Sequence, residues 1–367
     1  MIRALVSSPS PVFSSAFVVA LAFSLTACGR ACVGSSDSEP SSENAAASAS
    51  SHIDLGPRNF HQPRGSAPVY EGVGILFHSA KPGVWTPELD EHADPVKGLW
   101  GAGPHDIYSA GYDSKGMILA YSKGDGSWAP QKIERVGRLF AVWGSGAKDV
   151  FAAGTQRTIL HSHGDGAWAV ESSTDEDGGT TSLFSISGSG AKDVYAVGAG
   201  GVILHTHGTG KWLPEPSGVT SSLLSVFAVS ATDVYAVGDN GVILHKKADK
   251  WEPEPSGGNA TLWSIWGSSK SDLRAVGQAG LVLRSHGDGT WTKEDVGVKT
   301  PLISIWGSSA DDVYIAGLTG TLLHFTANAW TNAAPPNTGT NSFQTVWGDG
   351  HGALYLGGDK IHARPRL

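Results

Sequence analysis

The chain has 367 residues, of which 49 are glycine and 13 are tryptophan, while only 16% are charged. This composition favours short strands joined by tight turns over helices. With a net charge of -8, the chain lacks the positive potential that attracts nucleic-acid phosphates, so its charge argues against nonspecific nucleic-acid binding.

The first 58 residues indicate an export signal followed by a tether, and not part of a folded domain. Arg3 precedes the apolar run from Ala16 to Leu25, which is typical of a secretory signal and short for a membrane span. Residues 34–51 are almost all Ser, Ala, Glu and Asp, so we expect a disordered spacer. We therefore assign residues 1–27 to a signal peptide, 28–58 to a disordered tether and 59–367 to one folded domain.

The end of the predicted signal peptide reads Leu25-Thr26-Ala27-Cys28 and resembles the lipobox of bacterial lipoproteins. The resemblance implies a diacylglycerol on the Cys28 thiol, and Gly29, where an aspartate would mark inner-membrane retention, implies sorting to the outer membrane. The alternative is ordinary cleavage near Ala27. We expect an exported protein anchored by lipid to the outer membrane, on its periplasmic or cell-surface face. Since both cysteines, Cys28 and Cys32, lie in this region, no disulfide would stabilise the folded body.

From residue 66 onwards one pattern returns about every 41 residues, which is a period of repeat architectures. Its Trp-Gly element, or a substitute, begins at Trp100, Trp143, Ser187, Ala228, Trp266, Trp306 and Trp347. A second tryptophan closes most copies, at Trp85, Trp128, Trp168, Trp212, Trp251, Trp291 and Trp330. The two sets leave only Trp263 outside the pattern, so tryptophan belongs to the repeat itself.

Each copy predicts four short strands separated by glycine-containing turns, and no segment has the 3.6-residue period of a helix. Four strands in about 41 residues describe a propeller blade. The units formed by the second and third strands number eight, from Val69–Leu76 to Ala353–His362. We therefore predict an all-β fold, a single β-propeller with eight four-stranded blades, with seven blades as the alternative. Residues 53–60 would pair with the last unit and close the ring.

The repeat carries two resemblances to known groups of proteins. Ser304–Ser309 and Asp312–Gly317 resemble repeats in predicted lipoproteins of myxobacteria and related deltaproteobacteria, a group mostly without assigned function. More distantly, Ser162–Trp168 is similar to the Asp-box hairpin of sialidase and photosystem assembly-factor propellers, from which it departs by one residue in the spacing of the aspartate. Because the Asp-box is a structural turn, neither resemblance implies an active site.

Histidines and aspartates recur at fixed repeat positions. The histidines are His78, His161, His205, His245, His324 and His362, with His163, His207 and His286 two residues beyond. The aspartates, each before a second strand, are Asp106, Asp149, Asp193, Asp233, Asp272 and Asp312. We interpret the histidines as hydrogen-bonding groups of the blade, as in WD-repeat propellers, in preference to a transition-metal site. We expect the aspartates to accept from turn N–H groups.

A binding site is better sought where the copies differ. Loops from the second to the third strand, and from the fourth to the next first strand, share one face of a propeller. On that face the sequence places an aromatic, acidic, polar and basic set that suits a polar ligand or a protein. The predicted ligand-binding residues are Tyr112, Asp113, Lys115, Arg135, Arg138, Gln156 and Arg157.

No catalytic signature is present in the sequence, so we assign no catalytic residue. The acidic loop with Asp175, Glu176 and Asp177 lacks the remaining ligands of a Ca²⁺ loop, so we favour an acidic turn and expect no metal or cofactor. We predict a monomeric envelope lipoprotein that acts as a binding or scaffold propeller for a protein or glycan partner. The alternative is a sialidase-like hydrolase or lyase that acts on glycans in the channel mouth.

Overall fold

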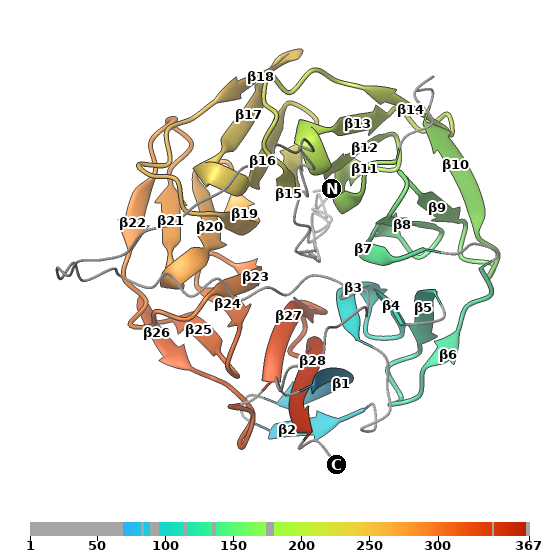
Figure 1. Ribbon diagram of the computed structural model, residues 1–367, viewed down its shortest axis with the longest axis vertical. Helices are drawn as coiled ribbons and strands as arrows, with labels where there is room; N and C mark the ends of the chain where they lie inside the picture. The colour runs from blue at the N-terminus through green and yellow to red at the C-terminus, as the bar shows by residue number, and fades with distance from the viewer. Residues whose placement is uncertain are drawn as a thin grey trace, which may run out of the picture. The chain divides into compact units, whose positions relative to one another are not determined.

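A computed structural model describes residues 69–81, 84–88, 95–113, 116–133, 137–173, 180–339 and 341–364. These residues form seven blades of four antiparallel strands around a central channel (Figure 1). The innermost strands of neighbouring blades contact each other all the way round the ring. The predicted signal peptide, the tether and residues 59–68 lie outside the described residues, as do Cys28 and the acidic loop with Asp175 and Asp177.

The strands of each blade run from the channel outwards. Blade 1 contains β3 (Val96–Gly103), β4 (Asp106–Tyr112), β5 (Met117–Ser122) and β6 (Ala129–Pro130). Blade 2 contains β7 (Leu139–Gly146), β8 (Asp149–Gly154), β9 (Ile159–Ser162) and β10 (Ala169–Ser173). Blade 3 contains β11 (Leu183–Gly190), β12 (Asp193–Gly198), β13 (Ile203–Thr206) and β14 (Lys211–Pro214). Blade 4 contains β15 (Leu223–Ser230), β16 (Asp233–Gly238), β17 (Ile243–Lys247) and β18 (Lys250–Pro253).

The remaining blades follow the same order. Blade 5 contains β19 (Leu262–Ser269), β20 (Asp272–Gly277), β21 (Val282–Ser285) and β22 (Thr292–Glu294). Blade 6 contains β23 (Leu302–Ser309), β24 (Asp312–Gly317), β25 (Leu322–Thr326) and β26 (Ala329–Asn332). Blade 7 contains β27 (Asn341–Gly348), β28 (Leu354–Arg364), β1 (Val69–Lys81) and β2 (Val84–Pro87). Three short 3-10 turns, η1 (Ala199–Gly201), η2 (Asp239–Gly241) and η3 (Gln278–Gly280), link second to third strands in blades 3 to 5.

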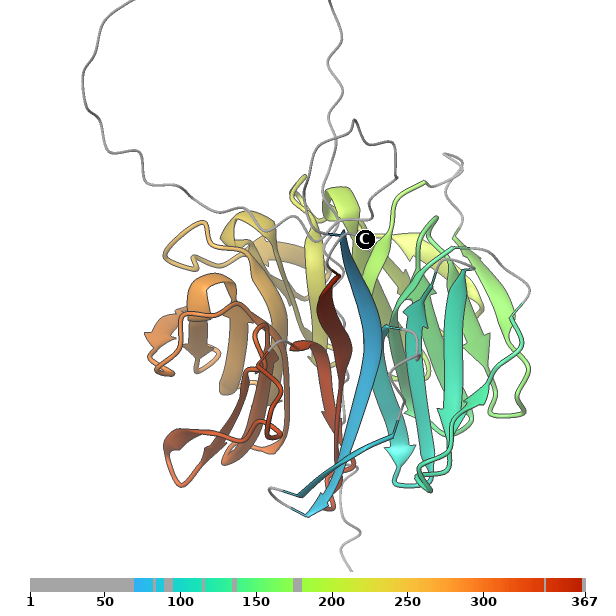
Figure 2. The ribbon, with the colours of Figure 1, turned by 60° about the horizontal axis from the view of Figure 1, so that its bottom comes forward.

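The prediction of eight blades is wrong, because the first and last units of the sequence form one blade. We counted two strands in Val69–Leu76 and two in Ala353–His362, but β1 and β28 are each one long strand without a turn. They pair antiparallel from Val69 opposite Arg364 to Ser79 opposite Leu354. Figure 2 shows β1, in blue, beside β28, in dark red. The amino-terminal strand β1 therefore closes the ring, in the place that we predicted for residues 53–60.

The Trp-Gly elements lock each inner strand to the next blade. A methyl group at Gly144 would lie 2.6 Å from Cη2 of Trp100 in the preceding blade, so the indole needs a glycine beneath it. The same contact joins Trp347 to Gly101, Trp143 to Gly188, Trp266 to Gly307 and Trp306 to Gly348. Blade 3 has Ser187 in place of the tryptophan, and blade 4 correspondingly has Ala228 in place of the glycine. Strand register thus puts Phe227, and not Ala228 as we predicted, at the tryptophan position of blade 4.

A chain of hydrogen bonds runs outwards through the seam between blades 2 and 3. Ser145 Oγ donates to Asp149, His161 Nε2 lies 2.8 Å from Asp149 Oδ1, and His161 Nδ1 lies 2.7 Å from Glu171. Glu171 then accepts from Trp212 Nε1 of the next blade at 2.7 Å. The predicted hydrogen-bonding role of the repeat histidines is confirmed for His161. We expected the aspartates to accept from turn N–H groups, but side chains engage both carboxylate oxygens of Asp149: Ser145 Oγ donates to Oδ2, and His161 Nε2 lies beside Oδ1.

The same relay recurs around the ring with local changes. His205, His245 and His324 also lie against the aspartate of their own blade, and His78 lies 3.2 Å from Glu88 in blade 7. His362 is in β28, opposite Glu71, and is not a member of the set. A closing tryptophan donates to the carboxylate of the preceding blade in the pairs Trp128–Glu88, Trp212–Glu171, Trp251–Glu215, Trp291–Glu254 and Trp330–Glu294. The closing tryptophans therefore act between blades.

Blade 5 carries the largest departure from this scheme. Arg274 replaces the tyrosine of the second strand and is fully buried, with Nε 3.2 Å from Glu294 and its guanidinium 4.6 Å from the ring of Phe325. In the seam between blades 3 and 4 the cation is Lys246, which lies 4.9 Å from the ring of Tyr195. In that seam the later blade supplies the cation and the earlier blade supplies the ring. In the seam between blades 5 and 6 the earlier blade supplies the cation, Arg274, and the later blade supplies the ring, Phe325, so the cation–π contact is kept with the two roles exchanged.

Candidate functional site

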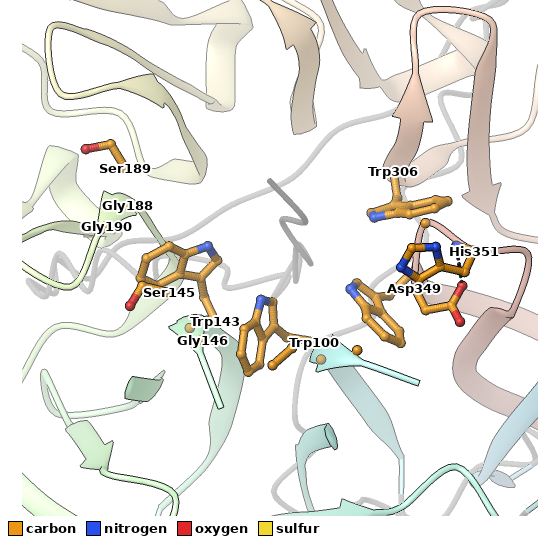
Figure 3. A pocket seen from close by; sticks show the side chains of 16 residues that line it. Trp100, Trp143, Ser145, Gly146, Gly188, Ser189, Gly190, Trp306, Asp349 and His351 are labelled. Carbon is orange, nitrogen blue, oxygen red and sulfur yellow. Dashed lines mark hydrogen bonds between the residues drawn. The ribbon is translucent and has the colours of Figure 1, made fainter. Parts of the chain in front are cut away.

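A pocket of about 490 Å³ lies at one mouth of the central channel. The turns from the first to the second strand of blades 1, 2, 3 and 7 line it, together with the tryptophans of four inner strands (Figure 3). Its lining residues are Trp100–Gly103, Trp143–Gly146, Gly188–Gly190, Trp306, Trp347 and Asp349–His351. The volume is in the range of small-ligand sites in proteins.

The pocket breaks the symmetry of the ring at one repeat position. The residue paired with the aspartate at the first turn is Gly103, Gly146 or Gly190 in blades 1 to 3, and Ser230, Ser269 or Ser309 in blades 4 to 6. The three glycines line the pocket and the three serines do not. A methyl group at any of these glycines would meet nothing within 4 Å, and their φ angles are not left-handed. Neither packing nor backbone conformation therefore requires glycine here.

The tryptophans at the mouth are held edge-on. Their benzene edges rest on the glycine of the next blade, so the nitrogen edges of Trp100, Trp143 and Trp306 face the open centre (Figure 3). These side chains are only 2–3% exposed, so they present N–H edges rather than broad apolar faces.

The polar groups of the pocket are fixed by their own hydrogen bonds. Asp349 Oδ1 accepts from the backbone N–H groups of His351, at 2.7 Å, and Ala353, at 3.0 Å. Ser145 and Ser189 each donate to the aspartate of their own turn at 2.5 Å. Because each hydroxyl has one proton, the serine oxygens can offer only lone pairs to a ligand.

The site predicted from sequence lies at the opposite end of the channel. Arg138 precedes β7, whereas Ser145 and Gly146 end it, so one strand separates the two regions. The structure brings Tyr112 and Arg138 together, with the guanidinium 4.8 Å from the ring centre. Lys97 lies 5.8 Å from the same ring and donates to Asp359 at 2.8 Å. Although burial opposes the charge, the carboxylate of Asp359 raises the pKa of Lys97 above its ordinary value, which keeps the ammonium group charged.

The other predicted residues fall in two turns. Asp113 closes the turn after β4, since its Oδ1 accepts from Gly116 N at 2.8 Å, while Lys115 and Arg135 lie outside the described residues. Gln156 and Arg157 both have left-handed backbone angles, with φ of 55° and 49°. At the position of Arg157 blades 3 to 6 have a glycine, so Arg157 holds a conformation that costs about 1 to 2 kcal/mol for a side chain with a Cβ. Its Nε donates to Thr181 at 2.8 Å.

A β-bulge begins every inner strand at this end. The residue skipped by the pairing is Lys97, Phe140, Phe184, Leu224, Trp263, Ile303 or Gln344. All seven are buried, and the rings of Phe140 and Phe184 in adjacent blades are 5.8 Å apart. This explains Trp263, the tryptophan outside the repeat: it is the bulge residue of blade 5.

Sequence reasoning missed both the pocket and the seam carboxylates, although each leaves a trace in the sequence. The carboxylates follow the closing tryptophan by three residues, as in Trp168 to Glu171 and Trp212 to Glu215. The pocket is marked by Gly in the first three copies where later copies have Ser. Both traces are seen only when the copies of the repeat are compared position by position, and that comparison becomes informative once the register of the strands is known.

Within the described ranges, no cluster of three or more His, Cys, Asp or Glu side chains is arranged to hold a metal ion. The same part of the chain contains no helix with the length and apolarity needed to cross a membrane.

Comparison with known proteins gives structural neighbours only. No family model and no curated protein matches the chain. Among solved structures, YCF48 bound to D1 peptide is 15% identical, with a TM-score of 0.57, covering 72% of this chain and 91% of that one. YCF48 from Cyanidioschyzon merolae is also 15% identical, with a TM-score of 0.57 and coverage of 80% and 98%. The WD40 β-propeller domain of Doa1 is 13% identical, with a TM-score of 0.57 and coverage of 73% and 94%. At these identities the likeness shows the β-propeller fold.

Proposed function

We propose that this protein is an exported envelope lipoprotein whose propeller binds a protein or glycan partner and acts as a scaffold. The lipobox-like end of the signal segment supports an anchor at Cys28, and the composition of residues 28–58 supports a tether to the outer membrane. The partner occupies the pocket at the channel mouth.

The observation that carries the binding role is the set of three glycines in adjacent blades that no packing or backbone constraint explains. Gly103, Gly146 and Gly190 keep the wall of the pocket bare, which is what a close approach of a ligand to the backbone requires. The fold neighbour YCF48, described in complex with D1 peptide, supports binding as a use of this architecture.

The number of carboxylates in the pocket favours a binding role over glycan hydrolysis. Most glycoside hydrolases place two carboxylates on either side of the scissile bond. Among the described residues that line the pocket, Asp349 is the single carboxylate, and its Oδ1 is engaged by two backbone N–H groups.

The experiment fills the pocket without disturbing the fold. The full chain, carrying Cys28→Ser to prevent lipidation, is used to capture partners from an envelope extract and from immobilised polysaccharides. Gly146→Gln puts a side chain into open space at the pocket wall, so it should abolish capture while the melting temperature stays unchanged. Ser269→Gln, at the same repeat position in blade 5 but away from the pocket, is the matched control and should capture normally.

Capture that survives Gly146→Gln, or that Ser269→Gln removes equally, would show that the partner does not use this pocket. The lipid anchor is tested separately by mass spectrometry of the wild-type chain, which should show a diacylglycerol on Cys28.

A further inference from the structure

Arg138 is an exception to the repeat at the end of the channel opposite the pocket. Its carbonyl oxygen lies against Gly154, where a methyl group would clash with it, and the same contact identifies its counterparts in the other blades. These counterparts are small polar residues or prolines, namely Pro95, Ser182, Ser222, Thr261, Pro301 and Ser342. Among the seven described blades, blade 2 alone has a long cationic side chain at this place.

Two cations converge on the ring of Tyr112, but a single carboxylate serves them. The guanidinium of Arg138 lies 4.8 Å from the ring centre, and Lys97 Nζ lies 5.8 Å from it. Lys97 is neutralised by Asp359, whose carboxylate is 2.8 Å away. Asp113 Oδ1 accepts from a backbone N–H group of its own turn, and Asp113 forms no ion pair with Arg138. One positive charge, that of Arg138, is therefore left without a counter-charge here.

The neighbouring seam shows which group is missing. Tyr112 and Asp359 hold the same place in their blades, directly after a glycine of the second strand. Toward blade 1, Asp359 supplies a carboxylate to the cation Lys97. Toward blade 2, Tyr112 supplies an aromatic ring to the cation Arg138 and no carboxylate. A carboxylate for Arg138 must therefore come from another source.

The guanidinium of Arg138 is nevertheless held in position. The side chain is half-buried, and the residue is fixed by Thr155, whose Oγ1 accepts from Arg138 N at 3.0 Å. The Tyr112 ring is fixed in turn by an edge-to-face contact with Phe140, with the ring centres 5.7 Å apart. A guanidinium that rests on an aromatic face keeps its N–H groups available at its edges. Within the described part of the chain, no hydrogen bond or ion pair engages them.

Charge and surroundings together favour a carboxylate of a protein. A singly charged carboxylate balances the one free cation and matches the paired N–H groups of a guanidinium, whereas a phosphate dianion would exceed that charge. Phe140 and Phe184 are buried, so neither offers a face on which a sugar ring could stack. An acidic side chain in a peptide segment therefore matches these residues better than an acidic glycan does.

We propose that this end of the channel is a second binding site, where Arg138, positioned by Tyr112, forms a bidentate ion pair with a carboxylate of an acidic peptide segment in a protein partner. The site goes beyond the proposed function, because it lies at the other end of β7 from Gly146 and uses none of the residues that line the pocket.

The test probes an array of random-sequence peptides with the full Cys28→Ser chain and with its Arg138→Gln variant. The peptides retained through Arg138 should share an Asp or Glu, and its exchange for Asn or Gln should weaken binding about ten- to a hundredfold, as Arg138→Gln does. The two changes together should cost no more than either alone. Arg138→Lys keeps the charge but not the fork of donors and should also weaken binding. Tyr112→Leu, which keeps the charge and removes the ring, should weaken binding about two- to fivefold.

Lys299→Gln is the matched control, because Lys299 is an exposed cation that precedes the first strand of blade 6 at the same end of the channel. It should bind the peptides as the wild type does, and so should Gly146→Gln. All variants should keep the melting temperature of the wild type, so that a loss of binding is not a loss of fold.

The proposal is overturned if no peptide is retained through Arg138, if the retained peptides share no acidic residue, or if Lys299→Gln weakens binding as much as Arg138→Gln. A uronic-acid oligosaccharide that binds through Arg138 while no peptide does would overturn the protein partner. None of these outcomes touches the proposed function, which depends on capture that Gly146→Gln abolishes.

Discussion

The seams between blades and the mouth of the channel are built from the same repeat, yet only the seams are nearly uniform. The Asp–His–Glu–Trp relay joins blades 2 and 3 and, with small changes, most other neighbours. At the mouth, three adjacent blades have glycine where the next three have serine. Because every blade must pack against its neighbour, the seam residues are nearly the same in all copies. A ligand contacts only some blades, so the residues at the channel mouth differ between copies.

If this contrast is correct, the largest losses of stability come from the seam. Glu215→Ala removes the carboxylate that accepts from Trp251 Nε1 at 2.7 Å and lies 2.8 Å from His205 Nδ1. It also leaves the buried Lys246 without its partner. We expect a loss of about 3 to 5 kcal/mol in the free energy of unfolding, measured by chemical denaturation, because buried donors and a buried cation lose their acceptor.

The control for this change is Glu252→Ala, since the Glu252 side chain is 54% exposed and lies 3.5 Å from Lys247. Its effect should stay within about 1 kcal/mol, as for other exposed ion pairs. Equal effects of the two substitutions would contradict a special role of the relay.

The second prediction compares two glycines that are two residues apart at the end of strand β7. A methyl group at Gly144 would lie 2.6 Å from both Trp100 and the carbonyl oxygen of Asp149, so Gly144→Ala should destabilise the fold by about 1 to 3 kcal/mol through overpacking. Gly146→Ala meets open space and should change stability by less than about 0.5 kcal/mol. Thermal unfolding of both variants checks this, and a large loss for Gly146→Ala would mean that this glycine serves the fold and not a ligand.

The smallest predicted effect is a pH dependence of the seam. Although burial disfavours its charged form, hydrogen bonds to Asp149 and Glu171 raise the pKa of His161 to about 9, from an ordinary value of 6.5. A raised pKa in the folded state stabilises the fold fully below pH 6.5 and loses that contribution as the pH rises through about 9. Allowing for solvent screening, the free energy of unfolding should fall by roughly 1 to 2 kcal/mol over this range because of His161.

Denaturation at a series of pH values would measure this slope. His161→Gln should flatten it, and His163→Gln, which removes a neighbouring imidazole whose ring centre is 4.5 Å away, should leave it in place. Glu215 has the opposite pH dependence. Although burial opposes its ionisation, hydrogen bonds from His205, Lys246 and Trp251 lower its pKa from 4.5 to about 2. The stability that ionised Glu215 gives the fold is therefore lost as the pH falls from 4.5 toward 2.

The candidate site shows where inference from sequence stops. The sequence marked Tyr112 and Arg138 as residues that differ between copies, and the structure places them in contact. The Gly103 position also differs between copies, but glycine is common in turns, and only the absence of any neighbour around it shows that it is not needed there. Arg274 is a similar case, because its burial depends on Phe325 of the next blade, about fifty residues along the chain.

By itself, the sequence determined the repeat, its four short strands and the recurrence of Trp, His and Asp, because each copy repeats the same local alternation and turn chemistry. The number of blades was decided only by the tertiary structure. Glycines such as Gly74 and Gly357 permit a turn or an extended strand equally well, so the pattern near each terminus was ambiguous. Pairing between β1 and β28 brings the first and last described strands into one sheet, and the extended form is the one that completes its hydrogen bonds.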